Sequence, residues 1–359
     1  MRLSRLVLAS AAFVLAVSPA LAGDILVTKS GKVLGNPKAG NPPAPGDYKD
    51  SLFQITEVTL SSVKYKLRGV PGTQAQPSEG IERIYFDPAT SPSEMAAAKD
   101  AEAQGDFPAA RALWEKVSAS NQKWAKDMGA FFAARTFWQE GDVAGAMQAL
   151  TAFKATYRDS WYLPQATRLN ARALLAGGKI AEARAEFESV KELKGVPVSE
   201  KNGADFWTSW IDEQLATRNN DQAGLKKAMT AYKTLKGKLA SMKDTASVQL
   251  GDRCALGVAS CQIALNDWKD AEKDLERMIS SAESPVTKAG AHTLMGNSIL
   301  AKNATSGDRA LYREALWHFL RVVCLYGTAE GAEDYRAEAM YKAGSMFSEL
   351  RPSGDTDAD

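Results

Sequence analysis

The residue types that most often carry out catalysis are scarce in this sequence. Among 359 residues it contains two histidines, His292 and His318, and three cysteines. None of the spacings that build a nucleophile elbow, a phosphate loop, a zinc protease site or a thiol redox pair is present. Gly177-Gly178-Lys179 lacks the first glycine and the final Ser or Thr of a phosphate loop. We therefore predict no catalytic residue, no cofactor and no metal site, and we expect both histidines in the core or at its rim.

The three cysteines do not suggest a disulfide framework. Cys254 and Cys261 are seven residues apart in one expected helix, which separates them by roughly 10 Å along its axis. That separation is too long for a disulfide. Cys324 lies in a different expected helix. We predict three buried cysteines that act as small apolar residues, with a redox or metal role as the alternative.

Aromatic and arginine side chains could instead bind another protein. Tryptophan is a favoured anchor at protein interfaces, and arginine can bind a carboxylate through two parallel hydrogen bonds. The alternative is that the aromatic side chains fill the interior and that the polar ones, among them Asn170, are solvated. The candidate partner-binding residues are Trp124, Arg135, Arg168, Arg172, Trp207 and Trp210.

The segment 23–87 has the pattern of a small β-rich module. Short apolar runs alternate with polar residues, as in Ser62-Val-Lys-Tyr-Lys-Leu. Two loops, 36–46 and 69–80, are rich in Gly, Pro and Asn and separate the runs. Four or five strands in this length predict a small open barrel or a curled sheet. The Pro-containing segment 88–92 is the expected linker to the rest of the chain.

The segment 93–350 repeats one helical phrase. The phrase occurs at Gly105-Asp, Gly141-Asp and Gly178-Lys, which are 36 and 37 residues apart, and again at Asn266-Asp. A small residue precedes each phrase by seven positions, and an alanine with large residues four and seven positions later follows it. This spacing makes one apolar stripe on each helix of a pair, and the small residues let the two helices approach closely. A period of this length is typical of a helical solenoid.

These phrases resemble the tetratricopeptide repeat (TPR) family. The resemblance covers about seven-tenths of the chain and includes two degenerate repeats, at 202–236 and 288–323, and a final capping helix. It implies a mainly α fold: a right-handed α-solenoid of about six helix pairs, preceded by the β module. It also implies that the first helix of each pair lines a concave groove, where the candidate tryptophans and arginines could hold a protein segment.

The N-terminal residues have the parts of a secretory signal peptide. Arg2 and Arg5 precede an apolar run, and Ala20-Leu21-Ala22 forms a small-residue cleavage site. We predict cleavage after Ala22 and export to the periplasm or beyond the cell, with an uncleaved membrane anchor as the alternative. No later run is long and apolar enough for a transmembrane helix. The segment 351–359 is an acidic tail that we expect to be disordered.

The charge balance excludes one large class of partner. The chain carries 44 Lys and Arg against 43 Asp and Glu, a net charge of +1, so no basic excess points to nucleic acid. The sequence therefore predicts an exported, non-enzymatic scaffold that binds a segment of another protein. We expect it to need no cofactor and to belong to a cell-envelope assembly. Two alternatives stay open. One is a structural subunit that self-assembles through strand edges of the β module, and the other is a small-ligand binder or enzyme.

Overall fold

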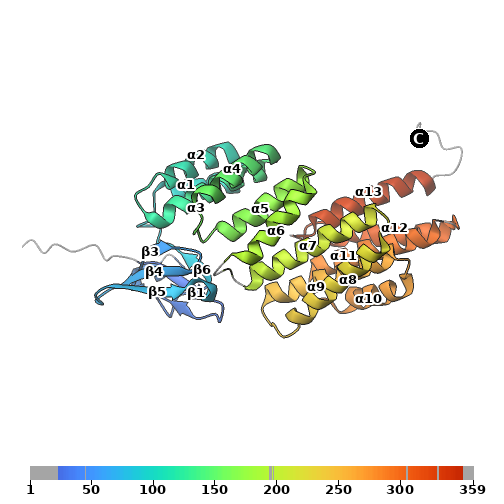
Figure 1. Cartoon of the computed structure of the whole chain (residues 1–359), viewed down its shortest axis with the longest axis horizontal. Helices are drawn as coiled ribbons and strands as arrows, with labels where there is room; N and C mark the ends of the chain where they lie inside the picture. Colours follow the sequence, from blue (N-terminus) through green and yellow to red (C-terminus); the bar gives the residue numbers. More distant parts are fainter. Residues whose placement is uncertain are drawn as a thin grey trace, which may run out of the picture. The chain divides into compact units, whose positions relative to one another are not determined.

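The chain divides into two compact units. The computed structural model describes residues 23–44, 46–193, 196, 198–304, 306–329 and 331–350, so the expected signal peptide and acidic tail lie outside the described residues. Contacts group the chain up to Ala166 as unit 1 and from Thr167 onward as unit 2 (Figure 1). Of the described residues, no helix is both long enough and apolar enough to cross a membrane.

The described β module consists of six strands in two antiparallel three-stranded sheets. One sheet has the order β2-β1-β6 and the other the order β3-β4-β5, where each strand follows its neighbour by a turn. The sheets are curled rather than closed into a barrel. The strands are β1 (Ile25–Thr28), β2 (Val33–Leu34), β3 (Phe53–Val58), β4 (Ser62–Leu67), β5 (Thr73–Pro77) and β6 (Ile81–Tyr85).

The expected loop 69–80 is wrong in its middle, where β5 forms. The sequence of β5, Thr-Gln-Ala-Gln-Pro, has no apolar alternation, and its residues are mostly exposed. Its backbone pairs with β4, with Gln74 opposite Tyr65. Because this ladder needs only backbone groups, side-chain periodicity could not reveal the strand.

Both sheets share a hydrophobic core with the first helices. Leu26 of β1 and Phe53 of β3 belong to the same cluster of buried side chains as Trp114 and Trp124. The linker 88–92 therefore separates sheets from helices in sequence without separating two cores.

The rest of the described chain forms six helix pairs and one final helix, which confirms the expected number. Successive helices of each pair are joined by short turns, except in the last pair. The pairs are α1 (Glu94–Ala103) with α2 (Phe107–Ser118), α3 (Lys123–Glu140) with α4 (Val143–Thr156), α5 (Leu163–Ala176) with α6 (Ile180–Glu192), α7 (Val198–Arg218) with α8 (Gln222–Leu239), α9 (Thr245–Ala264) with α10 (Trp268–Ser281), and α11 (Pro285–Asn303) with α12 (Arg309–Leu325); α13 (Glu333–Leu350) follows.

One backbone conformation explains the repeated phrase. One residue in each short turn has a positive φ, between 51° and 86°, in the left-handed region that glycine and asparagine tolerate best. An aspartate then caps the next helix in three of these turns; Asp142, for instance, accepts a hydrogen bond from the Gly145 backbone N–H. The positive-φ residues are Gly105, Gly141, Gly178, Asn220 and Asn266.

The small residues lie where the helices meet. Ala98, Ala134, Ala171 and Ala259 each stand seven residues before a turn, and all four are buried. The fourth pair departs from this rule, because the same position holds Glu213. Its buried carboxylate accepts a hydrogen bond from the Tyr232 hydroxyl at 2.8 Å.

Candidate functional site

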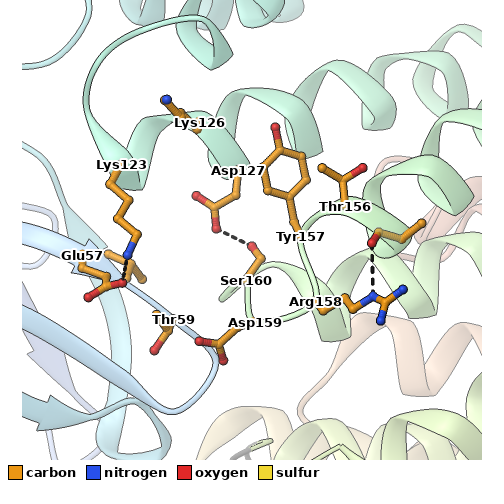
Figure 2. A pocket seen from close by; sticks show the side chains of 12 residues that line it. Glu57, Thr59, Lys123, Lys126, Asp127, Thr156, Tyr157, Arg158, Asp159 and Ser160 are labelled. Carbon is orange, nitrogen blue, oxygen red and sulfur yellow. Dashed lines mark hydrogen bonds and ion pairs between the residues drawn. The ribbon is translucent and has the colours of Figure 1, made fainter.

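Unit 1 contains an open pocket of about 530 Å³ (Figure 2). Three segments line it: the end of β3, the first turns of α3, and the loop that follows α4. Leu60 N–H donates to the Asp159 carbonyl at 2.8 Å, and Thr59 pairs with Ser160 as an isolated antiparallel bridge. These backbone bonds fasten the β3–β4 turn to the loop after α4 and so fix two walls of the pocket.

A buried carboxyl group forms one side of this pocket. Asp127 of α3 is only 7% exposed. Its Oδ2 accepts a hydrogen bond from the Ser160 hydroxyl, and its Oδ1 accepts one from the Met128 backbone N–H at 3.0 Å. Burial raises the pKa of Asp127 to about 6, and the two hydrogen bonds oppose that shift in part.

The other side of the pocket is charged and exposed. Glu57 forms ion pairs with Lys123 and with Lys64, the latter at 2.7 Å. Hydrogen bonds from Lys123 and then Lys64 lower the pKa of Glu57. Lys126 and Arg158 add positive charge to the lining (Figure 2). The lining thus places a buried carboxyl group opposite exposed positive charges, and it includes neither histidine nor cysteine.

Sequence reasoning did not find this pocket. Its residues are spread from Glu57 to Ser160 along the chain, and only the fold joins them. One signal was present: Asp127 interrupts a stretch of α3 whose neighbours Trp124, Ala125 and Met128 are apolar.

In unit 2, four of the predicted partner-binding residues occupy related positions. Arg168 stands ten residues before Gly178, the positive-φ residue of its turn, and Arg172 stands six before Gly178. Trp210 stands ten residues before Asn220, the positive-φ residue of the next pair. Residues at equal distance from the turn lie on the equivalent side of α5 and α7. We call Arg168, Arg172, Trp207 and Trp210 the first-helix surface.

The two tryptophans of the first-helix surface lie together and are only partly buried. The rings of Trp207 and Trp210 meet edge to face with centroids 5.7 Å apart. Trp207 also stacks on Phe187 of α6. Part of each ring therefore serves the core, and part is accessible to a partner.

The two arginines of this surface lie one helical turn apart on α5. Arg168 forms an ion pair with Glu200 at 2.5 Å. Partial burial lowers the pKa of Arg172, as do the nearby charges of Arg168 and Arg253, whereas Asp334 raises it. Both arginines on this side of α5 therefore have a carboxylate nearby.

The two predicted residues in unit 1 are engaged within the chain. Trp124 is 6% exposed and stacks on Phe86 with ring centroids 3.7 Å apart. It therefore lies in the core beneath the β module and not on an open helix face. Arg135 pairs with Glu102, and its guanidinium lies over the Phe132 ring at 4.3 Å.

Several buried side-chain amides in unit 2 are a feature that sequence reasoning largely missed. One polar atom of each has no hydrogen-bond partner in the described chain, and each residue lies on the first helix of its pair. A polar residue inside an apolar register is the only sequence signal, and it was visible for Asn170. The four residues are Asn170, Asn202, Gln262 and Asn297.

The histidines form one hydrogen-bonded pair. The Nδ1 atoms of His292 and His318 are 3.0 Å apart, so one ring donates to the other. Burial lowers the pKa of each to about 4, with help from the nearby charge of Arg321. Both are placed as expected, at the core and its rim. No cluster of three or more potential metal ligands occurs in the described part of the chain.

The expectation for the cysteines is correct for two of the three. Cys254 and Cys261 are buried, and burial raises the pKa of the Cys254 thiol to about 12. Cys324 is exposed, because it lies on the outer side of α12 while Val322, two residues earlier, faces the core.

Comparison with known proteins bears on the fold alone. No family model matches the chain, and neither does any curated protein. A solved tetratricopeptide repeat protein from Parabacteroides merdae is 10% identical, with a TM-score of 0.43 over 70% of this chain and 97% of its own. The TPR domain of P58(IPK) is 14% identical, with a TM-score of 0.30 over 72% of this chain and 66% of its own.

The class of protein is a TPR-like helical-repeat protein with an N-terminal two-sheet module. This assignment rests on the chain's own six helix pairs, their repeated left-handed turns and their matched small residues, because the overall likenesses are weak.

Proposed function

We propose that this chain is a non-enzymatic scaffold that binds a segment of another protein on its first-helix surface. The observation that carries the proposal is the partly exposed Trp207–Trp210 pair, which shares a helix register with Arg168 and Arg172. Tryptophan and arginine are the residue types that most often dominate binding energy at interfaces.

The chemistry of the surface suggests the kind of segment. The tryptophan rings suit an apolar side chain, and the arginines suit a carboxylate held by two hydrogen bonds. An acidic, partly apolar segment fits both.

The test is affinity capture from cell envelope with cross-linking at the surface. We expect wild type to retain a specific protein and Trp207→Ala/Trp210→Ala to lose at least tenfold in affinity for it. Arg168→Glu/Arg172→Glu provides a second variant, in which Arg168 is half-buried and pairs with Glu200 while Arg172 is exposed, so circular dichroism checks that it is folded. Tyr341→Ala, at an exposed aromatic of α13, is the matched control. Equal binding by wild type and both double variants would overturn the proposal.

We further propose that the chain is exported and acts in a cell-envelope assembly. The support is the signal-like pattern of residues 1–22, with cleavage after Ala22. We expect the exported chain to begin at Gly23, as measured by intact mass and N-terminal peptide sequencing. A chain that keeps Met1 and stays with the membrane pellet would favour the uncleaved anchor.

A further inference from the structure

Exposed apolar side chains gather on the last two helices. Among the described residues, nine large apolar side chains are exposed, and five of these lie on α12 and α13. Repeat proteins depend on a polar outer face at the terminal helices for solubility. An apolar terminal face is therefore expected to be covered. The five residues are Trp317, Leu325, Met340, Tyr341 and Phe347.

Helix α12 presents this face as one stripe. Its inner side, with Ala315, Phe319 and Val322, is buried against the core of unit 2. Its outer side carries Trp317, which is 63% exposed, and Leu325 eight residues later, which is 66% exposed. A spacing of eight residues leaves the two side chains about 80° apart around the helix, within one broad face.

Two opposite charges flank the exposed tryptophan. Glu314 precedes Trp317 by three residues and Arg321 follows it by four, and both are exposed. They are about 10 Å apart along the helix axis, too far to pair with each other. Neither side chain forms an ion pair in the described chain. Along α12 the stripe thus has the order negative, aromatic, positive.

We propose that this outer side of α12 binds the same side of α12 in a second copy of the chain. A twofold axis between Trp317 and His318 would run the two helices antiparallel. It would set Glu314 of each copy opposite Arg321 of the other, and the two Trp317 rings against each other at the centre. The same patch then serves both copies, as an isologous interface requires.

The charge order is what favours a second copy over a different partner. A stripe reading negative, aromatic, positive becomes its own complement when it is reversed. Both ion pairs would flank a ring pair that excludes water, where opposite charges interact more strongly than in bulk water. Because one helix from each copy buries a modest area, the dimer should be reversible and weak, with a Kd of roughly micromolar or above.

The test is the mass of the full chain by sedimentation velocity across a wide concentration range. We expect the mass to rise toward twice that of the monomer. Glu314→Arg and Arg321→Glu should each leave the chain monomeric at concentrations where wild type is dimeric, because each places like charges opposite one another. The double variant Glu314→Arg/Arg321→Glu should restore the dimer, since it re-creates both pairs between copies.

A control variant and a check that every variant is folded complete the experiment. Glu276→Arg makes the same charge change at an exposed position of α10 and should leave the dimer unaffected. All charge positions are exposed, so far-UV circular dichroism should show every variant folded. A chain that is monomeric throughout, or association that the single reversals leave unchanged or the double variant does not restore, would overturn the proposal. Association through residues 1–22, for example, would be left unchanged by both single reversals.

Discussion

Asp24 and Asp127 are buried carboxyls of unit 1 that differ in the donors they meet. Asp24 accepts two backbone hydrogen bonds, from Ile55 N–H at 2.7 Å and Asp87 N–H at 2.8 Å. Asp127 accepts one from a backbone N–H and one from the Ser160 hydroxyl. Burial raises the pKa of both to about 6. A hydroxyl can turn to accept a hydrogen bond, whereas a backbone N–H cannot.

We expect Asp127→Asn to stabilise unit 1 at pH 7.5 and to have little effect at pH 4. An acid whose pKa is higher in the folded state than in the unfolded state binds more protons when folded, so its contribution to stability falls as pH rises from about 4 to about 6. A shift of about two units corresponds to at most about 3 kcal/mol. Asparagine carries no charge, so the variant does not lose stability as pH rises. The Ser160 hydroxyl can accept a hydrogen bond from the asparagine amide. Urea unfolding at both pH values measures the difference.

Asp24→Asn is the matched control for this effect. An asparagine there would point its NH₂ at a backbone N–H and leave that donor unpaired, which costs about 1–3 kcal/mol. Burial raises the pKa of Asp24 as well, so removing its charge offsets this cost, and we expect Asp24→Asn to leave unit 1 about 1–3 kcal/mol less stable at pH 7.5 than Asp127→Asn does. If Asp127→Asn were destabilising at pH 7.5, the hydrogen bonds of the Asp127 carboxylate would outweigh the cost of burying its charge.

Single residues were predictable from sequence where their surroundings are local. The distances of Arg168, Arg172 and Trp210 from their turns can be counted in the sequence, because the glycine or asparagine of each turn is recognisable there. The burial of Trp124 could not be predicted this way. It depends on Phe86, which belongs to a module nearly forty residues earlier.

At the scale of elements, the fourth helix pair shows how a repeat tolerates a departure from its pattern. Glu213 occupies the position of a small residue, and the Tyr232 hydroxyl satisfies its carboxylate. The Tyr232 ring in turn packs over Gly257 of α9, where an added Cβ would come within 2.6 Å of it. The sequence marked this repeat as degenerate, but the compensating contacts join three helices and have no fixed spacing to detect.

We expect Gly129→Ala to destabilise the α2–α3 pair strongly. A Cβ on Gly129 would lie 2.5 Å from the Ser118 backbone nitrogen and 2.6 Å from the Trp114 carbonyl oxygen. These are backbone atoms of α2, so the two helices would have to separate, and we expect a cost of about 2–3 kcal/mol, as for overpacked cores. Thermal unfolding followed by circular dichroism measures it.

Gly203→Ala is the matched control, because the same added methyl meets open space on α7. Alanine favours a helix over glycine, so this change should stabilise the chain by about 0.5–1 kcal/mol. Similar effects of both substitutions would mean that the close approach of α2 and α3 does not limit the stability of the pair.

At the scale of the whole molecule, the boundary between the two units does not coincide with the change from strands to helices. The sequence places that change at 88–92, and the first helix, α1, begins at Glu94. The contacts instead divide the chain at Ala166, within α5. The reason is the shared core of unit 1, where side chains from both sheets pack with those of α1 to α3. Periodicity reveals the type of each element but not which elements bury one another's apolar faces.

This division predicts that local damage stays within one unit. Gly129→Ala strains unit 1, and Gly296→Ala strains unit 2, where the added Cβ would lie 2.7 Å from the Phe319 ring. Regions with separate cores open with separate free energies. By hydrogen exchange and mass spectrometry, we therefore expect Gly129→Ala to speed exchange in peptides from 23–162 and to leave those from 177–350 at the wild-type rate. Gly296→Ala should give the reverse, and faster exchange throughout the chain in either variant would show that the two units unfold as one.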